Sequence, residues 1–222
     1  MARRRPDFAE GRKRSVDNLQ RLYSVVVSLA VTEMLRRVLV GSSSALTPDL
    51  SKISVEQWLM MVSFLFTIVP FYHGANRYLD ATYITGERKA QRSALLIDFV
   101  FLFIEGVLFF VLAEFIGDQR AFYSTLAALL ALDAIWVGLS TKLWSLPSAG
   151  GADTSDTRYW PWAIMNVLAV TIIWVSARSN LWPDTTVQSI TLAGCAILRT
   201  VFDYILVFRF YYPPEYSEAP AR

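Results

Sequence analysis

The sequence predicts an all-α membrane protein with six transmembrane helices and with both termini in the cytoplasm. Three observations lead to this fold class: 54% of the 222 residues are hydrophobic, near-continuous apolar windows recur along the chain, and only short polar segments separate them. A helix of about 20 apolar residues, rising 1.5 Å per residue, covers the roughly 30 Å hydrocarbon core of a bilayer. The lipid bilayer is therefore the first expected partner.

The six apolar windows make one membrane domain of residues 18–212, between a basic arm of residues 1–17 and a tail of residues 213–222. The first window, 18–40, is interrupted by Glu33, Arg36 and Arg37. The third is the most continuous and reads SALLIDFVFLFIEGVLFFVLAEF. Gly, Pro, Ser and Asp in the connections are typical of turns between helices. The predicted spans are 18–40, 55–79, 93–116, 121–144, 160–177 and 187–210.

Lysine and arginine near the span ends predict the orientation. The N-terminal arm and the connection between the second and third spans carry most of these residues, and basic residues concentrate on the cytoplasmic side of membrane proteins. We therefore expect a multi-pass protein of the bacterial inner membrane. Aromatic residues near predicted span ends are expected at the membrane interface: Trp58, Trp144, Trp160, Trp162, Trp182, Tyr211 and Tyr212.

Charged residues inside the spans form a predicted intramembrane cluster. Glu105, Asp133 and Arg199 fall near the middle of their spans, and Asp203 follows Arg199 by one helical turn. Asp98 precedes Glu105 by seven residues on the same helix face, closer to the cytoplasmic end. Charges at this depth need partners, so the cluster is either an ion-pair network that holds the fold or a pathway for ions or protons.

The first span carries a polar seam that predicts a pore lining. Small hydroxyl residues recur every three or four positions, so they lie on one face of the helix. Such a seam either lines water or lets helices pack closely, and neighbouring apolar residues would form hydrophobic constrictions in a pore. The predicted pore-lining residues are Ser24, Val25, Ser28, Leu29, Thr32 and Leu35.

The cytoplasmic basic residues form the predicted ligand-binding set. They serve as a topology signal and a contact for anionic lipid, or they bind a polyanion such as a nucleotide or single-stranded nucleic acid through its phosphates. The set comprises Arg12, Lys13, Arg14, Arg88, Lys89 and Arg92.

The sequence contains no pattern that predicts an enzyme. The single histidine, His73, and the single cysteine, Cys195, leave no ligand spacing for a metal site, and no phosphate-binding loop or nucleophile motif is present. His73 is expected either to hydrogen-bond at a helix interface or to sense pH. We expect no cofactor and no bound metal.

Three stretches resemble the small prokaryotic relatives of the endolysosomal TMEM-type potassium channels. They are RLYSVVVSLAVT in the first span, SFLFTIVPFYHGANRYL in the second and LLIDFVFLFIEGVLFF in the third. The resemblance implies a six-span subunit that assembles as a tetramer, with the first helix lining the pore. The family's Phe-Ser-Asp signature is replaced here by residues 24–27, and Asp98 stands where the family tends to carry Asn. The build and the basic arm are also similar to Hailong-type antiphage channel effectors, which implies gating by an anionic nucleic-acid oligomer.

The sequence thus predicts a homo-oligomeric, cation-conducting channel whose pore is lined by the first span. A proton-coupled transporter that uses the intramembrane carboxylates is the alternative from another class. A membrane enzyme or a membrane-bound partner subunit is the third possibility.

Overall fold

Every regular element is helical within residues 8–40, 50–85, 92–143, 159–179 and 181–212, which the computed structural model describes. The all-α class is confirmed for this part of the chain. Three short elements accompany the long helices: η1 (Leu50–Lys52), the π-helical turn η2 (Asp80–Ile84) and α7 (Phe208–Tyr211). The long helices are α1 (Phe8–Val40), α2 (Val55–Leu79), α3 (Arg92–Glu114), α4 (Gln119–Leu143), α5 (Tyr159–Arg178) and α6 (Thr185–Leu206).

Five segments of the described chain are long and apolar enough to cross a membrane: α2 together with η2, α3, α4, α5 and α6. They fit a multi-pass membrane protein. The first predicted span, 18–40, is helical but does not reach this composition, because Arg21, Glu33, Arg36 and Arg37 lower its hydropathy. The helix α1 also begins at Phe8, within the predicted basic arm.

Short polar side chains set the starts of three of these helices. Ser54 caps α2, since its hydroxyl accepts from the Gln57 backbone N–H at 3.2 Å while the Gln57 side chain accepts from the Ser54 N–H. Asp118 and Asp184 cap α4 and α6 in a similar way, at 3.0 and 2.7 Å. Such caps satisfy N–H groups that have no partner in the first helical turn. The sixth predicted span, 187–210, is interrupted at Val207, which separates α6 from α7.

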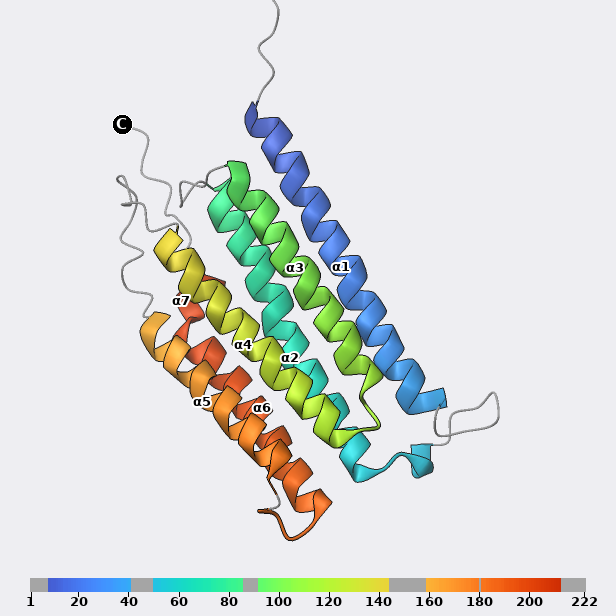
Figure 1. The fold of residues 1–222 in the computed structure, drawn as a ribbon. Coiled ribbons are helices and arrows are strands. Elements are labelled where there is room, and N and C mark those ends of the chain that lie inside the picture. The colour runs from blue at the N-terminus through green and yellow to red at the C-terminus, as the bar shows by residue number, and fades with distance from the viewer. Residues whose placement is uncertain (1–7, 41–49, 86–91, 144–158, 180, 213–222) are drawn as a thin grey trace, which may run out of the picture.

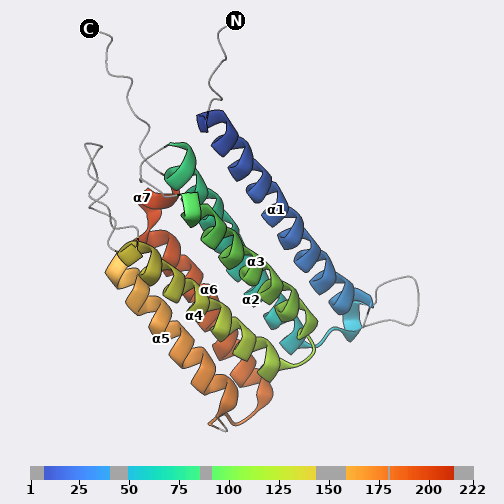
Figure 2. The ribbon, with the colours of Figure 1, turned by 45° about the horizontal axis from the view of Figure 1, so that its top comes forward.

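The long helices run up and down in a bundle with α1 at one edge and α5 at the other (Figure 1). The helix α1 packs on α3, α2 and η2, while α4 packs on α5 and α2 packs on α6. The start of α1 and the helix α7 lie at the same end of the bundle (Figure 2). This end is called the α7 end below.

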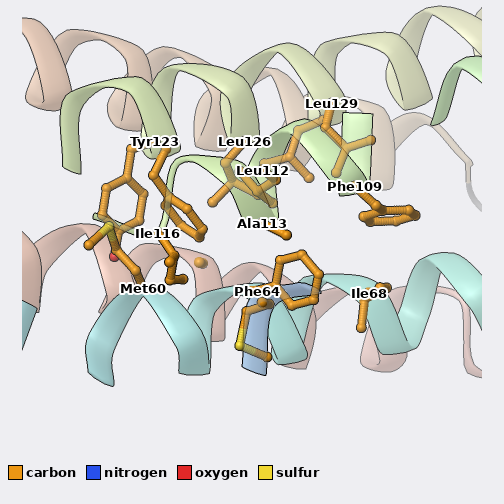
Figure 3. Close-up of a cluster of buried hydrophobic side chains, with 14 of the residues drawn as sticks. Met60, Phe64, Ile68, Phe109, Leu112, Ala113, Ile116, Tyr123, Leu126 and Leu129 are labelled. Atoms are coloured by element: carbon orange, nitrogen blue, oxygen red, sulfur yellow. The ribbon is translucent and has the colours of Figure 1, made fainter. Parts of the chain in front are cut away.

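The apolar core fills the half of the bundle away from the α7 end. Phe64 of α2, Phe109 of α3 and Leu126 of α4 are fully buried there, with side chains from all three helices pointing toward one another (Figure 3). Aromatic rings meet edge to face, as in the Phe64–Phe109 pair with centroids 6.5 Å apart. Lipid tails are as apolar as these side chains, so in a membrane the contribution of such a core comes from close packing.

Gly106 of α3 allows α1 to approach closely. A Cβ atom at this position would lie 2.5 Å from Cγ1 of Val26 on α1. Valine is branched at Cβ and cannot easily swing its methyl groups aside in a helix. The Gly106–Val26 contact therefore determines how closely α1 sits against α3.

We expect Gly106→Ala to destabilise the protein by about 1–3 kcal/mol, the usual cost of overpacking a core. Thermal unfolding in detergent measures this loss. Removing the opposing methyl groups in the Gly106→Ala, Val26→Ala double variant restores most of the lost stability. Equal stability of the parent and Gly106→Ala would contradict the close approach.

Candidate functional site

A cavity of about 120 Å³ lies between α2, α3, α4 and α6, beside α7. The structure brings all five residues of the predicted intramembrane cluster to its wall. Helix α3 contributes two of them because seven residues make nearly two helical turns, and α6 contributes two that are one turn apart. These residues are Asp98, Glu105, Asp133, Arg199 and Asp203.

Arg199 lies at the centre of this group, and its side chain is only 3% exposed. Its Nε donates to Asn166 Oδ1 at 2.9 Å. Its Nη2 lies 3.4 Å from Asp133 Oδ2 and 3.6 Å from Asp203 Oδ1, both longer than an ideal charged hydrogen bond. The guanidinium carbon lies 5.3 Å from the Phe71 ring centroid. Among the described residues Nη1 has no hydrogen-bond partner.

Asp98 and Asp203 each have both carboxylate oxygens hydrogen-bonded by neighbours. Tyr83 donates to Asp98 Oδ2 at 2.5 Å, and Tyr78 donates to Oδ1 at 3.5 Å. Asp203 Oδ1 accepts from the Trp162 indole N–H, and Oδ2 accepts from the Tyr211 hydroxyl at 2.6 Å. Both residues are 1% exposed. The hydrogen-bond acceptors of these two carboxylates are thus largely occupied by neighbours within the fold.

Glu105 and Asp133 are less completely paired. Glu105 accepts one hydrogen bond, from the Tyr23 hydroxyl of α1, through Oε1. Asp133 has Arg199 Nη2 as its hydrogen-bond partner among the described residues, and its side chain is 20% exposed. These two carboxylates are therefore the ones with oxygens available to a molecule in the cavity.

Among the partners of this site that the sequence analysis did not predict are Trp162, Tyr211 and Asn166. Trp162 and Tyr211 were expected at the membrane interface, but they are 6% and 8% exposed and donate to Asp203 from inside the bundle. Asn166 is fully buried and binds Arg199. An amide in the middle of an otherwise apolar span was the available signal for Asn166. No signal in the sequence predicted that Trp162 and Tyr211 point inward, because an aromatic residue near a span end can lie either at the membrane interface or inside the bundle.

Five of the six predicted pore-lining residues lie on the side of α1 that faces away from the bundle, and Ser24 lies at the edge of that side. Val25 and Leu29 are each 56% exposed and Leu35 is 39% exposed, whereas Tyr23, Ala30 and Met34 on the opposite side are buried. Ser28 and Thr32 are exposed as well, and Ser24 is half-buried.

The hydroxyl groups of this seam bond first to their own helix. Ser24, Ser28 and Thr32 each donate to the carbonyl oxygen four residues earlier, at 2.8 Å. The Ser24 hydroxyl also lies 2.9 Å from the Tyr72 hydroxyl of α2. Ser28 and Thr32 thus keep oxygen lone pairs on the open side of α1.

The predicted ligand-binding set is only partly within the described residues. Arg12, Lys13 and Arg14 are exposed in the first turns of α1, at the α7 end, and Arg14 pairs with Glu10. Arg92 is the first residue of α3. Arg88 and Lys89 lie outside the described residues.

His73 lies in an aromatic cluster near the cavity. Its ring centroid is 4.7 Å from that of Tyr211, and Nδ1 is 3.4 Å from the Tyr204 hydroxyl. Within the described ranges, no three or more His, Cys, Asp or Glu residues lie close enough to hold a metal ion.

No protein-family model, curated protein or solved structure matches the chain. Function is therefore inferred from the residues and their geometry.

We expect Tyr211→Phe to lower the free energy of unfolding by about 1–3 kcal/mol, because it leaves a buried carboxylate short of a donor while keeping the ring. Denaturant unfolding in detergent micelles measures the change. Tyr212→Phe is the matched control, since Tyr212 is 52% exposed. Equal losses in the two variants would show that the Asp203 hydrogen bond does not contribute.

Proposed function

We propose that this chain is the subunit of a homo-oligomeric ion channel of the bacterial inner membrane, with α1 as a sixth span that lines the pore. The resemblance to the TMEM-type channels implies a tetramer. The observation that carries the proposal is the open face of α1. Five of the six predicted pore-lining residues are exposed on one side of that helix, and Ser24 lies at its edge, where it contacts Tyr72 of α2. The resemblance to the TMEM-type channels supports the same helix as the pore lining, and cation conduction rests on that resemblance.

The composition of α1 supports an oligomer. A helix too polar for lipid on every side needs protein or water along part of its surface. Its charged end is already neutralised, because Glu33 bonds Arg36 and Arg37, and Arg37 bonds Glu114 of α3. The open face between Arg21 and Arg36 then carries only hydroxyl and apolar side chains. Copies of α1 around an axis would place this face against water.

Apolar residues on the same face supply the gate. Val25 and Leu29 are exposed one turn apart, and a ring of such side chains excludes water from a narrow pore. Ser28 and Thr32, between and beyond them, would provide oxygen atoms for a permeating ion.

Cysteine accessibility tests the pore lining. In a Cys195→Ser background, we expect a membrane-impermeant thiol reagent to block the current of Ser28→Cys and Leu29→Cys channels in planar bilayers. Ala30→Cys is the matched control, because Ala30 is 0% exposed and faces the bundle. Two results would contradict a pore lined by α1. One is block of the current through Ala30→Cys alone. The other is unchanged conductance in Leu29→Ala together with loss of conductance in a folded Glu105→Gln variant.

We further propose that the α7 end is cytoplasmic and that its basic residues bind an anionic regulator, such as a nucleic-acid oligomer in antiphage defence. Arg12, Lys13 and Arg14 are exposed there in the first turns of α1. Any ligand bound to them acts directly on the proposed pore helix. Phosphate contacts of this kind do not depend on base sequence and weaken as salt rises.

We expect a short single-stranded oligonucleotide on the α7 side to close the channel, and neutralising Arg12, Lys13 and Arg14 together to abolish the effect. Bilayer recordings with the oligonucleotide on either side check this. Lys52→Gln, on η1 outside this basic set, is the control substitution. Silence of folded, inserted protein in every condition would favour the proton-coupled transporter.

A further inference from the structure

The Arg199 guanidinium, on the wall of the cavity, has one nitrogen without a hydrogen-bond partner among the described residues. Arg199 Nη1 is buried and lacks an acceptor among the described residues, although the other two guanidinium nitrogens are engaged. An unpaired donor in a buried charged group costs more than an ordinary missing hydrogen bond. A molecule in the cavity that offers an anionic oxygen would remove this cost.

The same cavity holds acceptors that lack donors. Asp98 and Asp203 have both oxygens occupied by Tyr and Trp donors, but Glu105 and Asp133 each have one hydrogen bond among the described residues. These two residues come from α3 and α4, and both line the cavity. A positively charged donor between them would pair with both carboxylates.

We propose that the cavity binds a small zwitterion, with its anionic group on the Arg199 guanidinium and its ammonium group on Glu105 and Asp133. The cavity volume of about 120 Å³ is several times the space that one water molecule needs, which is room for a small amino acid or for the headgroup of a zwitterionic lipid. A bare metal ion fits less well, since the described carboxylates do not converge in threes. Trp136 and Phe71 supply apolar walls. This site does not depend on the proposed channel.

The test measures binding to the purified full-length protein in detergent by calorimetry. The probes are glycine and L-alanine, with acetate and methylamine as single-charge controls. We expect the amino acids to bind and the single-charge controls to bind much more weakly. Equal affinity for acetate, methylamine and L-alanine would overturn the zwitterion.

Variants then locate the binding. Glu105→Gln removes one charge while keeping the shape, and we expect it to weaken binding by about 10- to 100-fold. Ala75→Leu leaves the charges intact and fills part of the cavity, so it should abolish binding. Glu114→Gln, which changes a carboxylate at the opposite end of α3, is the matched control and should bind like the parent. Thermal unfolding checks that each variant is folded. If Ala75→Leu and Glu105→Gln bind the amino acids as tightly as the parent does, the proposed site is wrong.

A second arm separates a soluble ligand from a lipid headgroup. Native mass spectrometry after reconstitution compares nanodiscs of phosphatidylethanolamine with nanodiscs of phosphatidylglycerol. The lipid is identified as the source if the parent protein retains phosphatidylethanolamine, the Ala75→Leu variant releases it, and no amino acid binds. Amino-acid binding to delipidated protein identifies the soluble source. Absence of both overturns the proposal.

Tyr23 connects this site to α1, because its hydroxyl donates to Glu105 from the buried side of that helix. A ligand that binds to the Glu105 carboxylate would compete with the Tyr23 hydroxyl for it. If the proposed channel is correct, the ligand therefore changes the fraction of time that the channel is open, and Tyr23→Phe removes this effect while binding persists. Binding without any current would refute the channel and leave the ligand site standing.

Discussion

A guanidinium buried in an apolar helical bundle is the constraint on which the α7 half of this protein depends. The Arg199 side chain is only 3% exposed, so polar groups from neighbouring helices must compensate its charge. Asp133 of α4, Asn166 of α5 and Asp203 of α6 do so, and α7 returns Tyr211 to hold Asp203 in turn. One buried charge thereby links four helices. The partner groups also enclose the cavity, so the same interaction produces both the fold and the candidate site.

The other half of the bundle has a different basis. Phe64, Phe109 and Leu126 pack there without ionisable groups between them (Figure 3). In lipid, where apolar surface gains little from being covered, such packing depends on close fit, while polar contacts specify which helices are neighbours. Close packing thus dominates the half away from the α7 end, which also contains the Ser63–Tyr123 hydrogen bond, while hydrogen bonding and charge dominate the α7 half.

Helix α1 stands apart from both halves because it has one side on the bundle and one side open. Its buried side is attached through polar groups as well as packing: Gln20 donates to Asp80 at 2.9 Å and Tyr23 donates to Glu105. Gly106 lets the backbone of α3 lie close to α1, next to the Tyr23–Glu105 contact. Because α1 is attached in this way, a change in the cavity can shift α1 and therefore its open side. The two proposed sites are physically connected for this reason.

The sequence by itself determined that the chain is helical, where five apolar helices lie, and that Asp98, Glu105, Asp133, Arg199 and Asp203 need partners inside them. These are local properties, since hydropathy and helical period depend on neighbours along the chain. Only the tertiary structure decided that α1 runs on from Phe8, that Trp162 and Tyr211 turn inward to Asp203, and that Arg199 Nη1 has no acceptor among the described residues. Those outcomes depend on which helices meet and at what depth. Arg199 binds Asn166 and Asp133, which lie 33 and 66 positions away in the chain.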